Sequence, residues 1–121
     1  MTPRFVEPLL ESIRLAAQEA TGRHYNSVLL NYYRDGRDSM GMHSDDEPEL
    51  GPAPAIASIS FGATRTFILR HKSSKETLKL ALTDGSLLLM AGATQANWMH
   101  GINKTARPVG ARVNLTFRKI D

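Results

Sequence analysis

The sequence predicts a mainly β protein with one N-terminal helix (class α+β), whose strands form a double-sheet antiparallel core of jelly-roll type. Three observations support this fold class. Apolar residues at helical spacing are confined to the N-terminal segment. Five or six short segments after Asn26 instead have strand composition and are bounded by turn residues. No second helical stretch separates these segments, as it would in a parallel α/β sheet.

The N-terminal segment is predicted to be one helix that packs against a sheet. Leu9, Ile13 and Ala17 recur at helical spacing and form an apolar stripe. Pro8 suits the first turn of a helix, and Gly22 suits the position just past its end. We therefore expect residues 1–25 to form a supporting helical segment.

The remaining chain, residues 26–121, is expected to form the β core. Asp35-Gly36 and Asp84-Gly85 are turn signals between strands. Segments 56–63 and 65–72 are interpreted as a strand pair joined near Gly62-Ala63, and the proline-rich segment 46–55 as an irregular loop. The predicted strands are 27–33, 56–63, 65–72, 77–82, 86–90 and 112–120.

Length and composition favour one globular domain, residues 1–121. Hydrophobic residues make up 41% of the chain and charged residues 22%, which is ordinary for a soluble protein. Cysteine is absent, so a metal site would have to use His, Asp or Glu. No apolar run is long enough for a transmembrane span, and the N-terminus lacks a secretory pattern. We therefore expect a cytoplasmic protein without a membrane or an obligate protein partner.

The balance of charges is mildly basic. Fifteen Lys and Arg residues against twelve Asp and Glu give a formal net charge of +3. Such a balance permits a polyanionic partner such as nucleic acid, but the basic residues are spread along the chain. Charge alone therefore does not establish a partner.

The stretch MGMHSDDEPEL, residues 40–50, has two possible interpretations. His43 and Asp45 lie two residues apart, so on an extended backbone both side chains point to one face and could bind one metal ion. His100, in NWMHG, could supply a third ligand. Two histidines and one carboxylate form the facial triad of non-haem Fe(II) sites. The alternative is a solvated acidic loop that contains a histidine.

The segment RVNLTFR, residues 112–118, alternates between a polar and an apolar face. Val113, Leu115 and Phe117 are expected to pack into a core. If the opposite face lines a barrel, its two arginines need anionic partners, and a small dicarboxylate would satisfy both. A solvent-exposed edge is the alternative. The polar face carries Arg112, Asn114, Thr116 and Arg118, and Asn31 and Tyr33 add an amide and a phenol on one face of 27–33.

These elements together resemble the AlkB family of Fe(II)- and 2-oxoglutarate-dependent dioxygenases, over about Asn26 to Ile120. The resemblance rests on five motifs in the family's order and spacing. They are Asn31-x-Tyr33, HSDDEP at 43–48, IASISFGATRTF at 56–67, GATQANWMHG at 92–101 and RVNLTFR at 112–118. It implies a double-stranded β-helix core, with residues 1–121 as a single dioxygenase domain.

The resemblance also implies a role for each matching residue. It assigns His43, Asp45 and His100 to Fe(II), and Asp46 to the acidic residue that in relatives faces the damaged base or a nearby arginine. Trp98 is expected to pack beside His100 or to form a wall of the pocket. The residues expected to hold 2-oxoglutarate are Asn31, Tyr33, Arg112, Asn114, Thr116 and Arg118, with the two arginines on its carboxylates.

The implied activity is oxidative dealkylation of N-alkylated DNA or RNA bases. It consumes O2 and 2-oxoglutarate and releases formaldehyde, succinate and CO2. Because the chain begins close to the catalytic core, we expect the N-terminal nucleotide-recognition lid of the repair enzymes to be missing. A non-nucleic-acid substrate is therefore the main alternative. A zinc hydrolase with the same three metal ligands is another, although it leaves the paired arginines unexplained.

Overall fold

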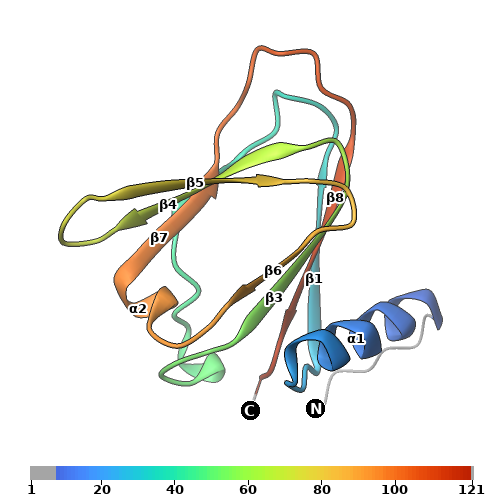
Figure 1. Ribbon diagram of the computed structural model, residues 1–121, viewed down its shortest axis with the longest axis vertical. Coiled ribbons are helices and arrows are strands. Elements are labelled where there is room, and N and C mark those ends of the chain that lie inside the picture. Colours follow the sequence, from blue (N-terminus) through green and yellow to red (C-terminus); the bar gives the residue numbers. More distant parts are fainter. Residues whose placement is uncertain (1–7, 121) are drawn as a thin grey trace.

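A computed structural model of the chain describes residues 8–120. Within this range, eight strands form two four-stranded antiparallel sheets that face each other (Figure 1). The first sheet has the order β1 (Ser27–Tyr33), β8 (Arg112–Arg118), β3 (Ile56–Gly62) and β6 (Leu87–Met90). The second has the order β2 (Met40–His43), β7 (Trp98–Ile102), β4 (Arg65–His71) and β5 (Thr77–Leu82). The predicted mainly β, double-sheet class is confirmed.

Helix α1 (Pro8–Thr21) lies beside the first sheet (Figure 1). It ends before Gly22, which adopts φ +69° and turns the chain toward β1. The predicted helix is confirmed over these residues, and residues 1–7 of the predicted segment lie outside the described range. No helix between residues 8 and 120 is long and apolar enough to cross a membrane. The cluster that joins α1 to the sheet contains Ala17, Tyr25, Ala57, Ile59, Leu115 and Phe117.

A second apolar cluster combines residues of both sheets. Its phenylalanine, Phe67 on β4, also contacts the ring of His100 on β7, with 5.2 Å between the ring centroids. Phe67 therefore places this cluster in contact with one of the predicted metal ligands. Its members are Tyr33, Ile56, Phe67, Leu82, Met90 and Ile102.

The predicted pairing of 56–63 with 65–72 is wrong. β3 pairs with β6 and β8, whereas β4 pairs with β5 and β7 in the other sheet. Gly62 separates them with φ +95°, a conformation that favours glycine. An added Cβ at this position would lie 2.4 Å from the carbonyl oxygen of Ala111. The glycine therefore marks the point where the chain changes sheets, not a hairpin turn.

Two strands and two short helical turns were not predicted. β2 and β7 pair with each other across more than fifty residues, and each is short, with four and five residues. Gly101 allows this pairing, because an added Cβ there would lie 2.7 Å from the Met40 carbonyl oxygen. The prediction that no second helical stretch is present was wrong, because α2 (Thr94–Asn97) forms a single helical turn. The loop 46–55 likewise contains one 3-10 turn, η1 (Pro48–Leu50).

We predict that Gly62→Ala lowers the free energy of unfolding by at least about 2 kcal/mol, because it adds backbone strain to a clash with Ala111. Gly22→Ala is the matched control. Gly22 also has a positive φ, but an added Cβ meets no atom within 4 Å, so the loss should be about 1 kcal/mol. Urea denaturation of both variants measures the difference. Equal losses of unfolding free energy in the two variants would show that the close approach of Gly62 to the Ala111 carbonyl oxygen does not contribute to stability.

Candidate metal and cosubstrate site

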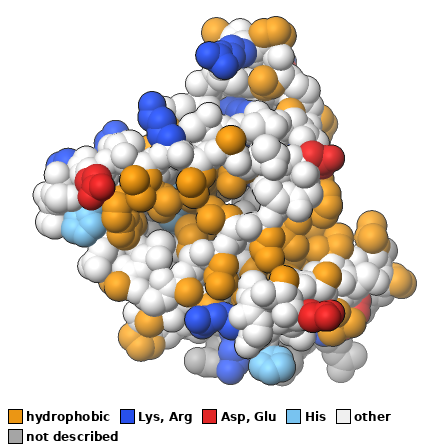
Figure 2. Space-filling view, in the orientation of Figure 1, with side chains coloured by type: hydrophobic (Ala, Val, Ile, Leu, Met, Phe, Trp, Pro, Cys, Tyr) orange, Lys and Arg blue, Asp and Glu red, His pale blue; other side chains and the backbone are white. Residues whose placement is uncertain are grey.

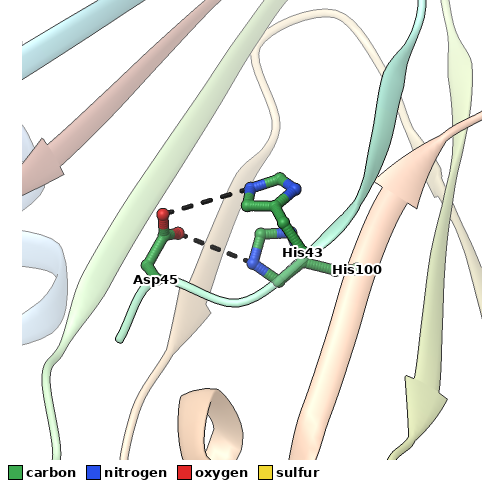
Figure 3. A group of neighbouring side chains, drawn as sticks. All are labelled: His43, Asp45 and His100. Carbon is green, nitrogen blue, oxygen red and sulfur yellow. Dashed lines mark ion pairs between the residues drawn. The ribbon is translucent and has the colours of Figure 1, made fainter. Parts of the chain in front are cut away.

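The structure brings together the three residues predicted to bind metal. His43 ends β2, and its register partner on β7 is His100, so the two rings lie side by side with 4.4 Å between centroids. Asp45 follows β2 by two residues, and its carboxylate points at both imidazoles (Figure 3). The Oδ2 atom of Asp45 lies 3.5 Å from Nε2 of His100, and Oδ1 lies 4.0 Å from Nε2 of His43. One ligand atom from each residue lies within 4.8 Å of the others.

Hydrogen bonding leaves these side chains free to act as ligands. Nδ1 of His43 lies 2.8 Å from the carbonyl oxygen of Gly41, to which it can donate, so that Nε2 faces Asp45. Apart from the contact of Nε2 with Asp45, neither ring nitrogen of His100 has a hydrogen-bond partner among the described residues, although the side chain is buried. Buried polar atoms rarely lack a partner. Two imidazole nitrogens and one carboxylate oxygen form the donor set that suits Fe(II), so these residues fit such an ion.

The carboxylate of Asp45 has a further partner in Arg118. Nη2 of Arg118 donates to Oδ1 of Asp45 over 3.0 Å. Burial raises the pKa of Asp45, but the imidazole of His100 and the charges of Arg118 and His43 outweigh this, so the pKa lies below its ordinary value. The ionised form required of a metal ligand is thereby favoured. Arg118 was predicted to bind a carboxylate of 2-oxoglutarate. Among the described residues, the carboxylate that it contacts is that of Asp45.

Arg112 is the most deeply buried of the charged residues on the polar face of β8. Its side chain is 1% exposed, and one nitrogen, Nη2, donates to Oγ of Ser60 over 2.8 Å. Nε and Nη1 have no partner, and no carboxylate within residues 8–120 lies at ion-pair distance. Burial lowers the pKa of Arg112, and the nearby Tyr33 only partly offsets this. A buried guanidinium without an anion is costly, so this position suits an anionic ligand.

The amide and hydroxyl residues of the polar face are buried beside Arg112. Nδ2 of Asn114 donates to Oγ of Ser58 over 2.7 Å, and the hydroxyl of Thr116 donates to Oδ1 of Asn114 over 2.8 Å. This face therefore turns inward, and the alternative of a solvent-exposed edge is wrong. The apolar residues Val113, Leu115 and Phe117 pack toward α1, as predicted.

The two residues predicted on 27–33 lie next to this face. Asn31 is half-buried and is the register partner of Asn114 on β8. Tyr33 is 3% exposed, and two guanidiniums lie over its ring, with Cζ of Arg112 4.8 Å and Cζ of Arg65 5.6 Å from the centroid. The inner ends of β1 and β8 therefore form one polar wall.

Two other predicted positions lie nearer to solvent. Asp46 is exposed and takes part in no ion pair with the described residues. Trp98 is half-buried, and its ring packs edge-on against His71 with 5.0 Å between centroids. Nδ1 of His71 in turn accepts hydrogen bonds from the backbone N–H groups of Ser73 and Ser74 in the turn between β4 and β5.

Sequence reasoning missed several residues that support the site. Ser58 and Ser60 alternate with apolar residues along β3, a pattern that could have placed them on the inner face. Arg65 and Gln95 gave no such signal, because their partners are distant in sequence. Arg65 is 4% exposed and donates to three backbone carbonyl oxygens in two loops. These belong to Asp35, Asp38 and Asn103.

We predict that Arg65→Met lowers the free energy of unfolding by about 2–3 kcal/mol, because it leaves these carbonyl oxygens without their charged donor. Arg70→Met is the matched control on the same strand. Arg70 is exposed, so its loss should stay within about 0.5 kcal/mol. Urea denaturation compares the two, and similar midpoints would contradict a clamping role for Arg65.

The comparisons with known proteins place the chain in a family context. The family model described as 2OG-Fe(II) oxygenase superfamily matches residues 1–118. The rat alpha-ketoglutarate-dependent dioxygenase alkB homolog 3 is 48% identical, and the alignment covers 93% of this chain and 41% of that protein. The mouse DNA oxidative demethylase ALKBH2 is 47% identical, with coverage of 99% and 54%. This chain thus spans about half the length of the curated relatives it matches.

A solved structure, described as the structure of OsALKBH1, has a similar fold. It has a TM-score of 0.71 with 20% sequence identity, and the match covers 97% of this chain and 67% of that one. At this identity the likeness concerns the fold, and it supports the predicted jelly-roll architecture.

Proposed function

The chain belongs to the 2OG-Fe(II) oxygenase superfamily and has a catalytic core of the AlkB type, and we propose that it removes N-alkyl groups oxidatively from nucleic-acid bases. For an N-methyl group, the overall reaction consumes one O2 and one 2-oxoglutarate and releases succinate, CO2 and formaldehyde with the restored base. The family supports the reaction class, and the matching motifs together with the geometry described above support the assignment of residues.

In this proposal His43, Asp45 and His100 hold Fe(II). The convergence of their ligand atoms supports the assignment, as does the lack of other partners for the ring nitrogens of His100. The bound iron, together with 2-oxoglutarate, supplies the activation of O2. The protein's own contribution is to orient the ligands: the carbonyl oxygen of Gly41 sets the ring of His43, and Arg118 donates a hydrogen bond to the carboxylate of Asp45.

The observation that carries the proposal is the buried guanidinium of Arg112, which has two nitrogens without a partner. A carboxylate of 2-oxoglutarate would satisfy them through charge-assisted hydrogen bonds. Asn31, Tyr33, Asn114 and Thr116 would complete the polar wall around the cosubstrate. Arg118 would act at the opposite end of β8, where it already contacts Asp45, and would there meet the second carboxylate.

The substrate proposal rests on the relatives, since two of those reported above are named as a DNA oxidative demethylase or an alkB homolog. The charge distribution adds little, because Lys and Arg side chains lie in separate places on the face shown in Figure 2. Asp46 directly follows the metal carboxylate and is exposed, so it could meet a base that enters the site. Alkylated DNA or RNA is therefore the proposed substrate, and a cytoplasmic location stays a prediction of the sequence.

The deciding experiment measures succinate formed from 2-oxoglutarate with Fe(II), in the presence and absence of an N-methylated oligonucleotide. The proposal predicts succinate and formaldehyde in equal amounts when the oligonucleotide is present. Succinate formation without demethylation would support the oxygenase activity but contradict nucleic acid as the substrate. Tight Zn(II) binding with no turnover of 2-oxoglutarate would favour a hydrolase, which gives the buried Arg112 no role.

A further inference from the structure

Asp45 lies beyond the end of a strand, so strand pairing does not fix its position. β2 ends at His43, where the register with β7 also ends. Its carboxylate must nevertheless stay within reach of both imidazoles. Outside the sheet, a backbone position is fixed by hydrogen bonds from other groups. Within residues 8–120, the backbone N–H of Asp45 donates such a bond to Oε1 of Gln95 over 2.8 Å.

Gln95 is a buried residue with a defined orientation. It is 1% exposed and lies in α2, the single helical turn before β7. Its Nε2 lies 3.6 Å from Sδ of Met90, a weak acceptor, so Oε1 is the end of the amide that faces Asp45. α2 is itself fixed to the residue that follows β4, because the N–H of Lys72 donates to the carbonyl oxygen of Asn97 over 2.8 Å.

The same short segment also carries His100. β7 follows α2 directly, and Oγ of Ser44 donates to the carbonyl oxygen of Trp98 over 2.7 Å. Residues 95–100 therefore present one metal-binding imidazole and also hold the backbone on which Asp45 is placed. Any shift of α2 would change the distance between these two groups.

We propose that Gln95 is a positioning residue, which fixes Asp45 relative to His43 and His100 through the bond to its backbone N–H. This inference rests on the proposed role of the three residues as metal ligands. Gln95 is not a member of the cluster of candidate ligands, and its action passes through Asp45. Loss of a group that holds a metal ligand typically costs 10–100-fold in metal affinity.

The test is Gln95→Met in the full chain, since methionine has a similar length but no oxygen acceptor. Purified metal-free protein is titrated with Co(II), whose visible absorption reports the geometry of its ligands. We expect the variant to bind Co(II) at least about tenfold more weakly than the wild type, with an altered spectrum. Ile56→Val is the control, because it shortens a fully buried core side chain and leaves every hydrogen bond of the site in place.

The control should lower the melting temperature while its Co(II) affinity and spectrum stay those of the wild type. Wild-type affinity and spectrum in Gln95→Met would overturn the inference while leaving the proposed function intact, whereas failure of the wild type to bind Co(II) would overturn both. A second measurement needs no variant: the amide proton of Asp45 should be protected from hydrogen exchange in the wild type. Rapid exchange at that amide would also overturn the inference.

Discussion

His43→Ala should reduce Fe(II)-dependent succinate formation by more than about 100-fold, because it removes a ligand rather than a group that supports one. His43 is the most exposed of the three ligands, with 36% of its side chain accessible, so the variant should fold. The measurement is succinate release at saturating 2-oxoglutarate, combined with the melting temperature. A large loss of activity at an unchanged melting temperature is the expected result.

His24→Ala is the matched control for this prediction. His24 is exposed, follows α1, and belongs to no cluster of metal-binding side chains within the described residues. Its variant should keep wild-type turnover. Full activity in His43→Ala would refute the iron assignment, and excess Fe(II) should not restore the variant, because the site would keep only two protein ligands.

Arg112→Met should raise the 2-oxoglutarate concentration needed for half-maximal turnover by about 30-fold or more. Loss of one partner of a buried charge pair costs about 2–5 kcal/mol, and each 1.4 kcal/mol corresponds to a factor of ten. Arg107→Met is the control, since Arg107 is exposed on the loop before β8. The measurement is the initial rate as a function of 2-oxoglutarate concentration for both variants.

The same substitution should leave the stability of the ligand-free protein unchanged or raise it. The guanidinium of Arg112 is buried without an anionic partner, and its replacement by an apolar side chain of similar length removes the cost of that charge. The two effects thus have opposite signs. An unchanged 2-oxoglutarate requirement would refute the binding role, and a strong loss of stability would show that Arg112 serves the fold instead.

Local sequence patterns predicted much of the fold. Pro8 and Gly22 bracket α1 because the fixed φ of proline suits a helix start and glycine adopts a positive φ at low cost. The alternation in 112–118 placed its polar and apolar residues on opposite faces, as observed. The spacing of His43 and Asp45 also indicated a shared metal site, and the structure brings His100 to it. Apart from the arrival of His100, each of these signals lies within a few residues of its consequence.

The sequence alone thus determined the type of most elements and the alternation of polar and apolar faces along 112–118, and its motifs identified candidate ligands for iron and 2-oxoglutarate. Only the tertiary structure decided which strands pair, as the separation of β3 from β4 shows. It also revealed the contacts of Arg118 and Gln95 with Asp45, across 73 and 50 residues. The physical reason is that periodicity and turn chemistry are local, whereas pairing depends on which distant groups satisfy one another once the two sheets pack together.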